Sequence, residues 1–510
     1  MSGAHGRGWA VATPHTLATA AAQDAFEHGG TAVDAALWAA VTLAAVYPHM
    51  CGVGGDLFAL VHDPSTGTDA INASGRAPLE TQVDAVATDG TMPQSGPFTI
   101  TVPGAVSGWQ LLHAAGAQLP WTDAFAHGIE HAERGIEMPG SIRRRGSIGR
   151  VANDAGLAAV FLDGDRFKES LHQPALAATL RALASEGPRA LYDGPVGQRL
   201  VAFLTSIGNP MAARDLRAHQ ADHATPLRAR FAELELVVAP PNSQGYVLLT
   251  MMRAIEDLGI GQDPFGTDAA DLARVFAVAS EDRDRLLADP ESMPALDLSQ
   301  RVREVSRDAQ RRRLEPVAGH RHGDTIALVA ADAQGRCVSL IQSLYSGFGA
   351  GYLDPETGII PHDRGAGFTL EVGHPNRLAP GKRPAHTLMP VLGFRDGAPA
   401  WVAGTMGGSA QPQIHAQLLL RRTGTAAEIV AAPRWLLGGM EPVDPDDPLV
   451  VVEPQVPSAA RDALASGGLR LEEAPADDDW VGHAHLITID EHAVFMIGSD
   501  PRADGAAAAG

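Results

Sequence analysis

The order of apolar and polar positions predicts a chain in which strands and helices alternate. Short apolar runs bounded by turn residues suit buried strands, whereas longer segments with apolar residues three and four apart suit helices. The alanine run at 506–509 is expected to be disordered. The expected strands are 9–13, 57–61, 234–238, 326–331, 337–344, 391–394, 401–405, 449–452, 485–489 and 494–497, and the expected helices include 15–28, 32–46, 246–258, 268–288 and 413–421.

The segment 326–344 carries the clearest hairpin signal. It opens with an apolar run, continues through an Asp-Ala-Gln-Gly turn signal at 332–335, and closes with a second strand-like run. If the two strands pair about this turn, Thr325 stands beside Gln342 or Ser343. The hairpin therefore places a threonine at the head of a core strand, next to another polar side chain.

A strand-heading threonine that faces a second hydroxyl is the arrangement of an N-terminal-nucleophile hydrolase. In that chemistry the Thr325 hydroxyl is activated by its own free α-amino group, which requires cleavage between Asp324 and Thr325. The charged segment 299–313 lies directly upstream. A flexible lead-in suits such a cleavage site, and a solvated helix is equally compatible. An ordinary threonine in an ordinary strand is the alternative.

Length, charge and cysteine content limit the possible partners. The 510 residues suffice for two domains or one large layered domain. A net charge of −21 argues against a nucleic-acid partner. The longest apolar run, 35–47, is too short to span a membrane, and no apolar signal segment opens the chain, so we expect a cytoplasmic protein without a membrane partner. Cys51 and Cys337 are expected to be buried free thiols.

Several motifs suggest cofactor or metal sites that their context does not support. The glycine cluster at 51–56 follows a helix and opens a strand, which is the reverse of a dinucleotide-binding loop. His483 and His485 would share a strand face without a carboxylate or cysteine ligand. The acidic clusters at 444–447 and 477–479 lack the glycine and spacing of a calcium loop. We therefore expect neither a cofactor nor a metal.

Two other features suit the binding of an anion. Arg76 follows Ser-Gly at a strand end, where it is either a carboxylate anchor or a solvated surface charge. Gly407 and Gly408 lie between a strand and a helix. Backbone N–H groups at such a junction suit an oxyanion, although a tight turn is the alternative.

Taken in order, these segments resemble the γ-glutamyltransferase family of N-terminal-nucleophile hydrolases over nearly the whole chain. Each motif is weak alone, and the ordered set is specific. The motifs are Gly-Gly-Thr-Ala-Val-Asp-Ala-Ala at 29–36, Gly52-Val53-Gly54-Gly55, Ser74-Gly75-Arg76-Ala77-Pro78, Val102-Pro103-Gly104-Ala105, Gly323-Asp324-Thr325, Gly381-Lys382-Arg383-Pro384, Gly407-Gly408-Ser409 and Ser499-Asp500-Pro501-Arg502.

The resemblance implies an α+β fold of the four-layer αββα type. It also implies one precursor that cuts itself into a large subunit, 1–324, and a small subunit, 325–510, which together form one domain. A single pair of subunits and a dimer of such pairs are both compatible with the family.

The resemblance also implies roles for individual residues. Thr325 looks like the nucleophile, and Ser343 matches the hydroxyl residue that hydrogen-bonds it. Gly407 and Gly408 resemble the oxyanion-binding pair, and Arg76 resembles the arginine that grips a substrate carboxylate. The implied cycle is attack on an amide carbonyl, loss of the amine, and hydrolysis or transfer of the acyl group.

The positions that recognise a γ-glutamyl amino group in this family are largely changed, and Arg364 adds a cation. The segment 362–368 is similar to that of the divergent, non-secreted branch that includes oxamate amidohydrolase. The altered positions are Ile326 and Ala327 in place of Thr-His, Tyr345 in place of Asn, Gly367 in place of an acidic residue, and His386 and Thr387 in place of two serines.

Three functions follow as hypotheses. The leading one is a self-processing Thr amidohydrolase that cleaves an amide of a small carboxylate-bearing substrate through an acyl-enzyme. A true γ-glutamyl hydrolase or transferase acting on glutathione or related amides is the second. A non-catalytic family member is the third. For the first, the expected substrate-binding residues are Arg76, Tyr345, Arg364, His386 and Thr387.

Overall fold

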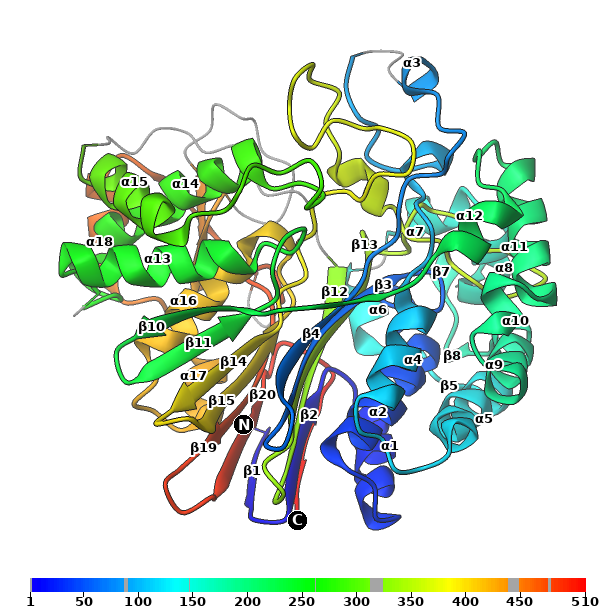
Figure 1. Cartoon of the computed structure of the whole chain (residues 1–510), viewed down its shortest axis with the longest axis horizontal. Helices are drawn as coiled ribbons and strands as arrows, with labels where there is room; N and C mark the ends of the chain where they lie inside the picture. Colours follow the sequence, from blue (N-terminus) through cyan, green and yellow to red (C-terminus); the bar gives the residue numbers. More distant parts are fainter. Residues whose placement is uncertain are drawn as a thin grey trace.

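Two seven-stranded sheets stack face to face in the middle of the molecule, and helices cover the outer face of each sheet (Figure 1). The expected α+β class and αββα layering are confirmed, and each expected strand and helix lies within a few residues of its predicted bounds. This computed structural model describes residues 2–86, 90–145, 147–261, 263–311, 324–438, 449–475 and 478–510.

One sheet contains the predicted hairpin at its centre. In spatial order its strands are β21 (Ala506–Ala509), β2 (Trp9–Thr13), β12 (Asp324–Asp332), β13 (Cys337–Tyr345), β3 (Asp56–Asp63), β4 (Gly67–Ala73) and β9 (Asp222–Ala224). The other sheet is ordered β1 (Ser2–Gly6), β20 (Phe495–Ser499), β19 (Ala484–Ile489), β15 (Ala398–Thr405), β14 (Val391–Arg395), β11 (Leu234–Val238) and β10 (Leu227–Phe231).

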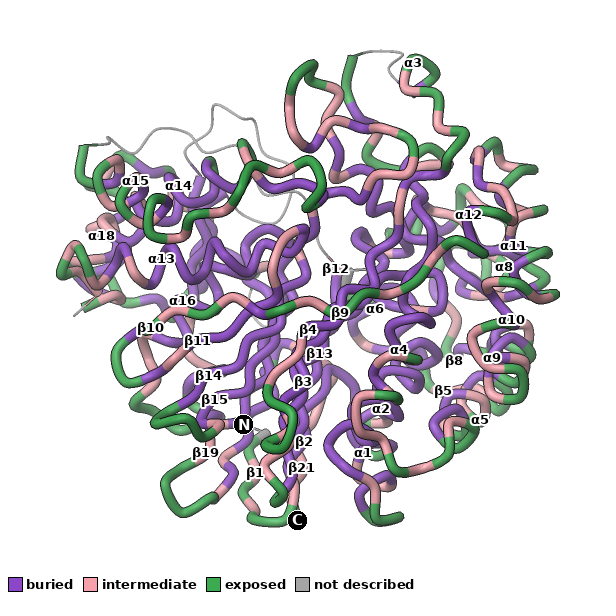
Figure 2. The backbone as a smooth tube through the Cα atoms, viewed as in Figure 1, coloured by how far each residue is buried: buried purple, intermediate pink, exposed green. Residues whose placement is uncertain are grey.

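The central strands are buried on both faces, which explains their nearly continuous apolar sequence (Figure 2). Successive side chains of a strand point to opposite faces. In β12, Ala327 and Val329 therefore face the other sheet, whereas Ile326 and Leu328 face the covering helices. The same alternation sends the side chain of Thr325 into the space between the two sheets.

Helix α2 (Ala32–Val46) is fully buried against the hairpin sheet. It begins with a capping box, in which Thr31 accepts from the backbone N–H of Asp34 and the Asp34 carboxylate accepts from that of Thr31. The helices on this side also include α1 (Thr16–Glu27), α4 (Ala105–Ala114), α5 (Ala126–Arg134) and α9 (Pro174–Glu186). The other sheet is covered by α13 (Gly245–Leu258), α14 (Ala269–Leu286), α15 (Leu298–Arg311), α16 (Gln411–Leu420) and α18 (Ser458–Ser466).

Shorter elements complete the described part of the chain. The small sheets pair β5 (Ile136–Glu137) with β8 (Ser170–Leu171), β6 (Leu162–Asp163) with β7 (Arg166–Phe167), and β16 (Trp435–Leu437) with β17 (Leu449–Val452) and β18 (Arg470–Glu473). The remaining helices are α3 (Val83–Val86), α6 (Gly140–Arg145), α7 (Ile148–Ala152), α8 (Ala155–Phe161), α10 (Arg189–Tyr192), α11 (Pro195–Ser206), α12 (Ala213–Ala218) and α17 (Ala426–Ala431), with 3-10 turns η1 (Pro97–Thr99), η2 (Trp121–Phe125), η3 (Arg364–Gly367) and η4 (Gly408–Ala410).

The expectation of a disordered alanine tail is wrong. Ala506–Ala509 forms β21, which pairs with β2 from Ala10↔Ala509 to Thr13↔Ala506. An edge strand can be held by its backbone hydrogen bonds alone, so a run of alanines without a strand-like side-chain pattern can still form one. The same reasoning applies to the glycine-containing strand β1, which the sequence pattern also missed.

Some sequence expectations concern residues outside the described ranges. The charged segment upstream of Thr325 forms α15 as far as Arg311, which agrees with the helical alternative there, but 312–323 are not described. Gly323 of the Gly-Asp-Thr motif, the acidic cluster 444–447 and the first residue of the cluster 477–479 likewise fall outside.

The predicted large and small subunits are interleaved within one fold. Strands from both 1–324 and 325–510 occur in each of the two large sheets, and Thr325 lies at the head of a central strand. The division into subunits stays a prediction.

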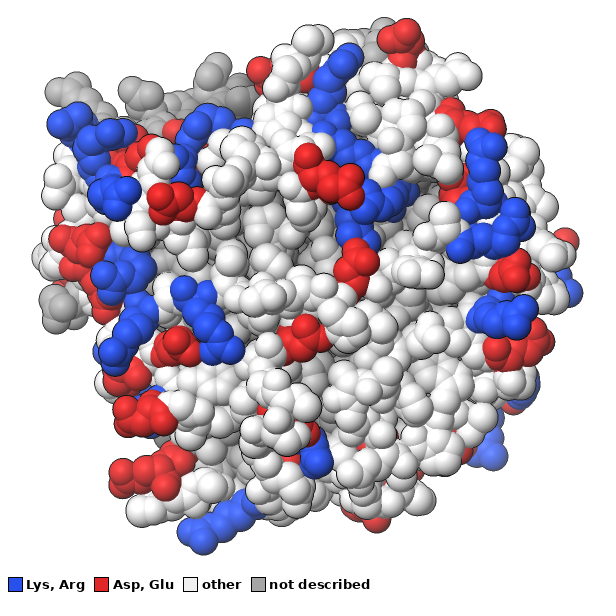
Figure 3. Space-filling view, in the orientation of Figure 1, with Lys and Arg blue, Asp and Glu red and all other residues white. Residues whose placement is uncertain are grey.

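The charged side chains, the two cysteines and the apolar helices are arranged as follows. Basic and acidic side chains are interspersed on the face that Figure 3 shows. Cys51 and Cys337 are buried free thiols, as expected. Within the described ranges no helix has the length and apolar content to cross a membrane.

Candidate functional site

The hairpin register places Thr325 opposite Ser343, which resolves the choice left open by the sequence. The Thr325 hydroxyl donates to the Ser343 hydroxyl at 3.0 Å, and both side chains are buried. Gln342 instead pairs with Ile326 and points to the helix layer, where its amide donates to the Ala40 carbonyl at 2.8 Å. The two hydroxyls therefore form the centre of the candidate site.

Ser343 also contacts the peptide bond that precedes Thr325. Its hydroxyl donates to the Asp324 carbonyl oxygen at 2.6 Å and accepts from the Tyr345 N–H at 2.7 Å. The strand pairing is irregular between Asp324 and Thr325. Tyr345, opposite Asp324, has φ of +77°, a conformation uncommon for a residue with a side chain. The backbone around the expected cleavage site thus departs from a regular ladder, and one hydroxyl holds its carbonyl.

The two glycines predicted to bind an oxyanion follow β15, which packs against β12. Gly404 of β15 lies against Ala327, two residues beyond Thr325. Gly407 has φ of +153°, a backbone conformation that residues with a side chain rarely adopt, so the loop favours a glycine there. Among the described residues, neither Gly407 nor Gly408 N–H has a hydrogen-bond acceptor. These donors suit a negatively charged oxygen.

Two buried side chains fix this glycine loop from behind. Gln244 Nε2 donates to the Gly408 carbonyl at 2.9 Å and to the Thr387 carbonyl at 2.7 Å. Arg283 Nη1 donates to the Ser409 carbonyl at 2.8 Å. The side-chain amide of Gln244 therefore links the loop that contains the two glycines to the segment that contains Thr387.

A cavity of about 310 Å³ opens beside these loops. Its wall includes four of the five residues expected to bind substrate, and also Arg283 and Ser409. Thr325 is fully buried and is not among the residues that line the cavity, whereas Tyr345, which pairs in the sheet with the preceding residue Asp324, is a lining residue. The four expected residues are Tyr345, Arg364, His386 and Thr387.

Arg364 is the central cation of this cavity wall. Its guanidinium carbon lies 3.8 Å from the centre of the Tyr345 ring, and Nη1 donates to Thr387 Oγ1 at 3.1 Å. A Cβ atom at Gly367 would lie only 2.2 Å from Arg364 Nη2. Glycine in place of the family's acidic residue therefore makes room for the guanidinium.

Arg76, the fifth expected residue, lies outside this cavity. It lines a neighbouring one of about 250 Å³ with His219 and Arg383. Its guanidinium is paired with Asp289 at 3.2 Å and donates to the Gly381 carbonyl at 3.0 Å. The carboxylate-binding role of Arg76 stays a prediction, and the structure does not bring it together with Arg364.

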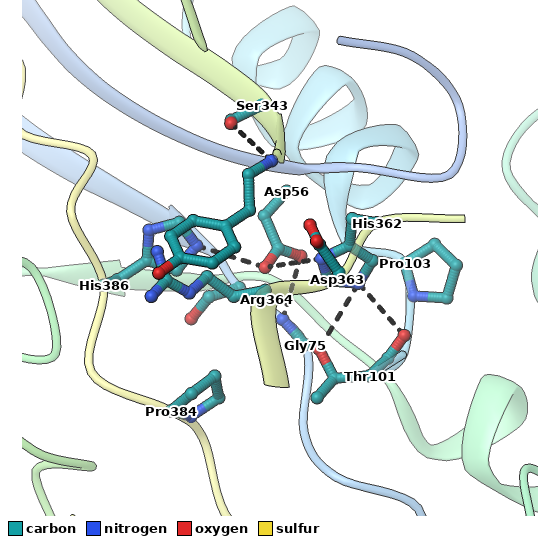
Figure 4. A network of polar contacts seen from close by, with 12 residues as sticks. Asp56, Gly75, Thr101, Pro103, Ser343, His362, Asp363, Arg364, Pro384 and His386 are labelled. Atoms are coloured by element: carbon teal, nitrogen blue, oxygen red, sulfur yellow. Dashed lines mark hydrogen bonds and ion pairs between the residues drawn. The ribbon is translucent and has the colours of Figure 1, made fainter. Parts of the chain in front are cut away.

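Sequence reasoning missed a buried carboxylate below the cavity. Asp56 Oδ1 accepts from the Gly75 N–H at 3.1 Å, and Oδ2 lies 3.1 Å from His386 Nε2 and 3.5 Å from His362 Nδ1 (Figure 4). Burial acts to raise the pKa of Asp56, but His362, His386 and the Gly75 N–H outweigh it and lower that pKa. Burial lowers the pKa of His386 to about 4, so its ring is neutral at pH 7.

The missed residues had only faint sequence signals. Asp56 ends the glycine cluster at 51–56, and Gln244 stands in a Pro-Pro-Asn-Ser-Gln-Gly segment before a helix. Arg283 has no distinguishing neighbours within its helix. A charged residue that closes a glycine cluster was the one clue in the sequence to a buried role.

The chain is similar to known proteins over nearly its whole length. The gamma-glutamyltranspeptidase family model matches residues 18–510. The oxamate amidohydrolase proenzyme of Klebsiella pneumoniae is 33% identical, with 98% of each chain covered. The glutathione hydrolase-like YwrD proenzyme of Bacillus subtilis is 31% identical, covering 98% of this chain and 97% of the relative.

Solved structures show the same fold. The crystal structure of cephalosporin acylase from Bacillus halodurans has a TM-score of 0.89 and 28% sequence identity to this chain. The match covers 100% of this chain and 97% of the acylase. The likeness therefore extends over both large sheets.

Proposed function

This chain belongs to the γ-glutamyltranspeptidase family, and from that premise we propose that it is a self-processing threonine amidohydrolase for small carboxylate-bearing amides. The observation that carries the proposal is the Thr325–Ser343 hydroxyl pair, in which Ser343 also holds the Asp324 carbonyl. In this pair the proposed nucleophile, its hydrogen-bond partner and the peptide bond to be cut lie next to one another in the sheet.

Self-processing begins at the uncut chain. The Thr325 hydroxyl oxygen attacks the Asp324 carbonyl carbon, the hydroxyl proton passes to the amide nitrogen, the C–N bond breaks, and the Asp324 acyl group moves from nitrogen to oxygen as an ester. The Ser343 hydroxyl stabilises the charge that develops on the carbonyl oxygen. Water then hydrolyses the ester, which gives Asp324 a terminal α-carboxylate and restores the hydroxyl of Thr325, whose α-amino group the acyl shift has already freed.

The freed amino group serves the amidase reaction. It takes the proton of the Thr325 hydroxyl as that oxygen attacks the substrate amide carbon. The N–H groups of Gly407 and Gly408 supply donors for the resulting oxyanion. The tetrahedral intermediate loses its amine, and hydrolysis of the acyl-enzyme by water restores the hydroxyl.

Arg364 is the feature of the cavity wall that supports a carboxylate-bearing substrate, because the wall as a whole carries Asp284 and Glu371 as well as Arg283 and Arg364. Arg364 occupies the space beside Gly367, where an acidic side chain would be needed to hold the ammonium of a γ-glutamyl group. Arg offers planar, paired donors that match a carboxylate. The name of the Klebsiella relative, an oxamate amidohydrolase, points to the same substrate class.

Release of ammonia or amine from defined amides tests this proposal. The processed protein is expected to release ammonia from oxamate and to leave glutathione intact. Turnover of glutathione without turnover of oxamate would favour the γ-glutamyl alternative that the Bacillus relative's name suggests. The Thr325→Ala variant should be inactive, with Thr66→Ala in an exposed turn as the matched control. Equal cleavage by wild type and Thr325→Ala would overturn the proposal.

A further inference from the structure

Asp56 is the third member of a cross-strand row that begins with the nucleophile. Thr325 is opposite Ser343, and Ser343 is in turn opposite Asp56. Residues in register on neighbouring strands share a face of the sheet. The two apolar residues that follow on this face, Ala327 and Phe58, belong to the core between the sheets. The Asp56 carboxylate therefore points from the hairpin sheet into the same space as the nucleophile.

The Asp56 carboxylate is directed toward the cavity wall. With a relative exposure of 1%, it depends on protein partners to replace water. Those partners are the Gly75 N–H and two histidines, which Figure 4 shows on opposite sides of the carboxylate. His362 precedes Arg364 by two residues, and His386 directly precedes Thr387. One carboxylate thus contacts both segments that bring Arg364 and Thr387 together.

Both ring nitrogens of His386 are engaged within the protein. Nδ1 accepts from the Leu388 N–H at 3.3 Å, which assigns the ring proton to Nε2, where it is donated to Asp56. The backbone of His386 is fixed as well, because its N–H donates to the Asn242 carbonyl and its carbonyl accepts from the Gln244 N–H. The ring therefore lines the cavity without a nitrogen to offer a substrate.

We infer that Asp56 and His386 are positioning residues for carboxylate recognition. Asp56 sets the spacing of the segments 362–364 and 386–387, so that Arg364 and Thr387 present their donors to one substrate carboxylate. His386, which was expected to bind substrate directly, acts through Asp56 instead. This inference rests on the proposed function and adds the residues that give its binding site a fixed shape.

The Asp56→Asn variant tests the inference through its hydrogen-bond pattern. Both carboxylate oxygens accept hydrogen bonds, one from the Gly75 N–H and the other from His386 Nε2–H. The side-chain amide nitrogen of the variant would therefore face one of these two donors, and in either orientation one of the contacts that hold the two segments is lost. We expect KM for oxamate to rise about tenfold or more, as for loss of a hydrogen bond to a charged group. KM for the uncharged analogue oxamide should change little, and self-processing should continue.

Two substitutions at His386 test the same contact in case the Asp56→Asn variant does not fold. In His386→Gln, the side-chain amide can donate from near the Nε2 position, so KM for oxamate should stay close to wild type. His386→Phe retains a ring without donors and should raise KM as Asp56→Asn does. Thermal unfolding and the extent of processing are measured for each variant.

The results separate this inference from the proposed function. If wild type does not cleave oxamate, the proposed function fails. If wild type cleaves it and the variants lose kcat equally for oxamate and oxamide with unchanged KM values, Asp56 and His386 serve stability only, and the inference is overturned. Selective loss of oxamate affinity, with recovery in His386→Gln, is the expected result.

Discussion

Gly367 and Arg364 share one space in the wall of the cavity. The guanidinium lies where any side chain at position 367 would begin, 2.2 Å from a Cβ atom there. The Tyr345 ring covers the other side of Arg364. The sign of the charge offered to a substrate is thus decided jointly by these positions, and substitution of either changes both the shape and the charge of the site.

Substitution of Gly367 by Asp tests this relation. The new carboxylate would displace Arg364 or pair with it, so KM for oxamate should rise roughly tenfold to a hundredfold, the range for loss of a charge-assisted hydrogen bond. Steady-state kinetics measure the effect. Gly149→Asp adds the same charge at an exposed helical position and should leave KM unaltered. An unchanged KM in Gly367→Asp would contradict the role of Arg364.

At the scale of elements, the β12–β13 hairpin aligns the groups needed for processing. Ser343 bonds both the Thr325 hydroxyl and the Asp324 carbonyl, and it accepts from the Tyr345 N–H. Ser339 lies on the same strand and face, where it donates to the Ala403 carbonyl at 2.7 Å and has a structural role. The pair offers a matched comparison of two buried hydroxyls.

Removal of the Ser343 hydroxyl should slow self-processing. The expected loss in Ser343→Ala is about a hundredfold, comparable to removal of one oxyanion donor. Appearance of the cut fragments on a denaturing gel over time measures the rate. Ser343→Thr should recover much of it, while Ser339→Ala should process normally despite lower stability. Equal rates in Ser343→Ala and wild type would exclude a role for this hydroxyl.

Sequence periodicity predicted the hairpin but not its register. A shift of one residue exchanges the two faces of a strand, and Gln342 and Ser343 were equally compatible with the turn. The cavity was predictable where its residues follow recognisable motifs, as with Arg364 and Thr387. Asp56, Gln244 and Arg283 were not, because the partners that give them a role in the site lie more than a hundred residues away, and those contacts depend on how the sheets stack.

At the scale of the whole molecule, the two expected subunits share both sheets. The hairpin strands β12 and β13 lie between β2 and β3 of the N-terminal portion, and β14 pairs with β11 from that same portion. The core between the sheets contains residues from both portions. Cleavage before Thr325 therefore leaves each part dependent on the other for its core.

The cut fragments should remain together in native solution. Size-exclusion chromatography of the processed protein should give one peak containing both fragments, and denaturant should be required to separate them, because each sheet would otherwise lose neighbouring strands. Elution of the two fragments in separate peaks under native conditions would contradict this arrangement. The uncut Thr325→Ala variant supplies the size standard.

Acid should destabilise the fold through its buried histidines. His415 is fully buried in α16, and burial lowers its pKa from 6.5 to about 3. Between these values the unfolded chain binds a proton that the folded protein does not. His415 therefore has no effect on the pH dependence above pH 6.5. As the pH falls from 6.5 toward 3, its protonation in the unfolded chain lowers the free energy of unfolding by about 1.4 kcal/mol per pH unit.

Replacement of His415 by Leu should make stability less dependent on pH. Urea unfolding between pH 4 and 7 measures the slope of the unfolding free energy, which should decrease by the equivalent of about one proton. His492→Leu, at an exposed position, should leave the slope as in wild type. An equally steep slope in His415→Leu would show that another group controls the acid sensitivity.

The identity of the residue at the new N-terminus tests the central claim most directly. Intact-mass analysis and N-terminal sequencing of the purified protein should find two fragments, 1–324 and 325–510, with the second beginning at Thr325. The Thr325→Ala chain should remain at its full length of 510 residues. A wild-type chain that stays whole after prolonged incubation, or one cut at another position, would contradict the assignment of Thr325 as the nucleophile.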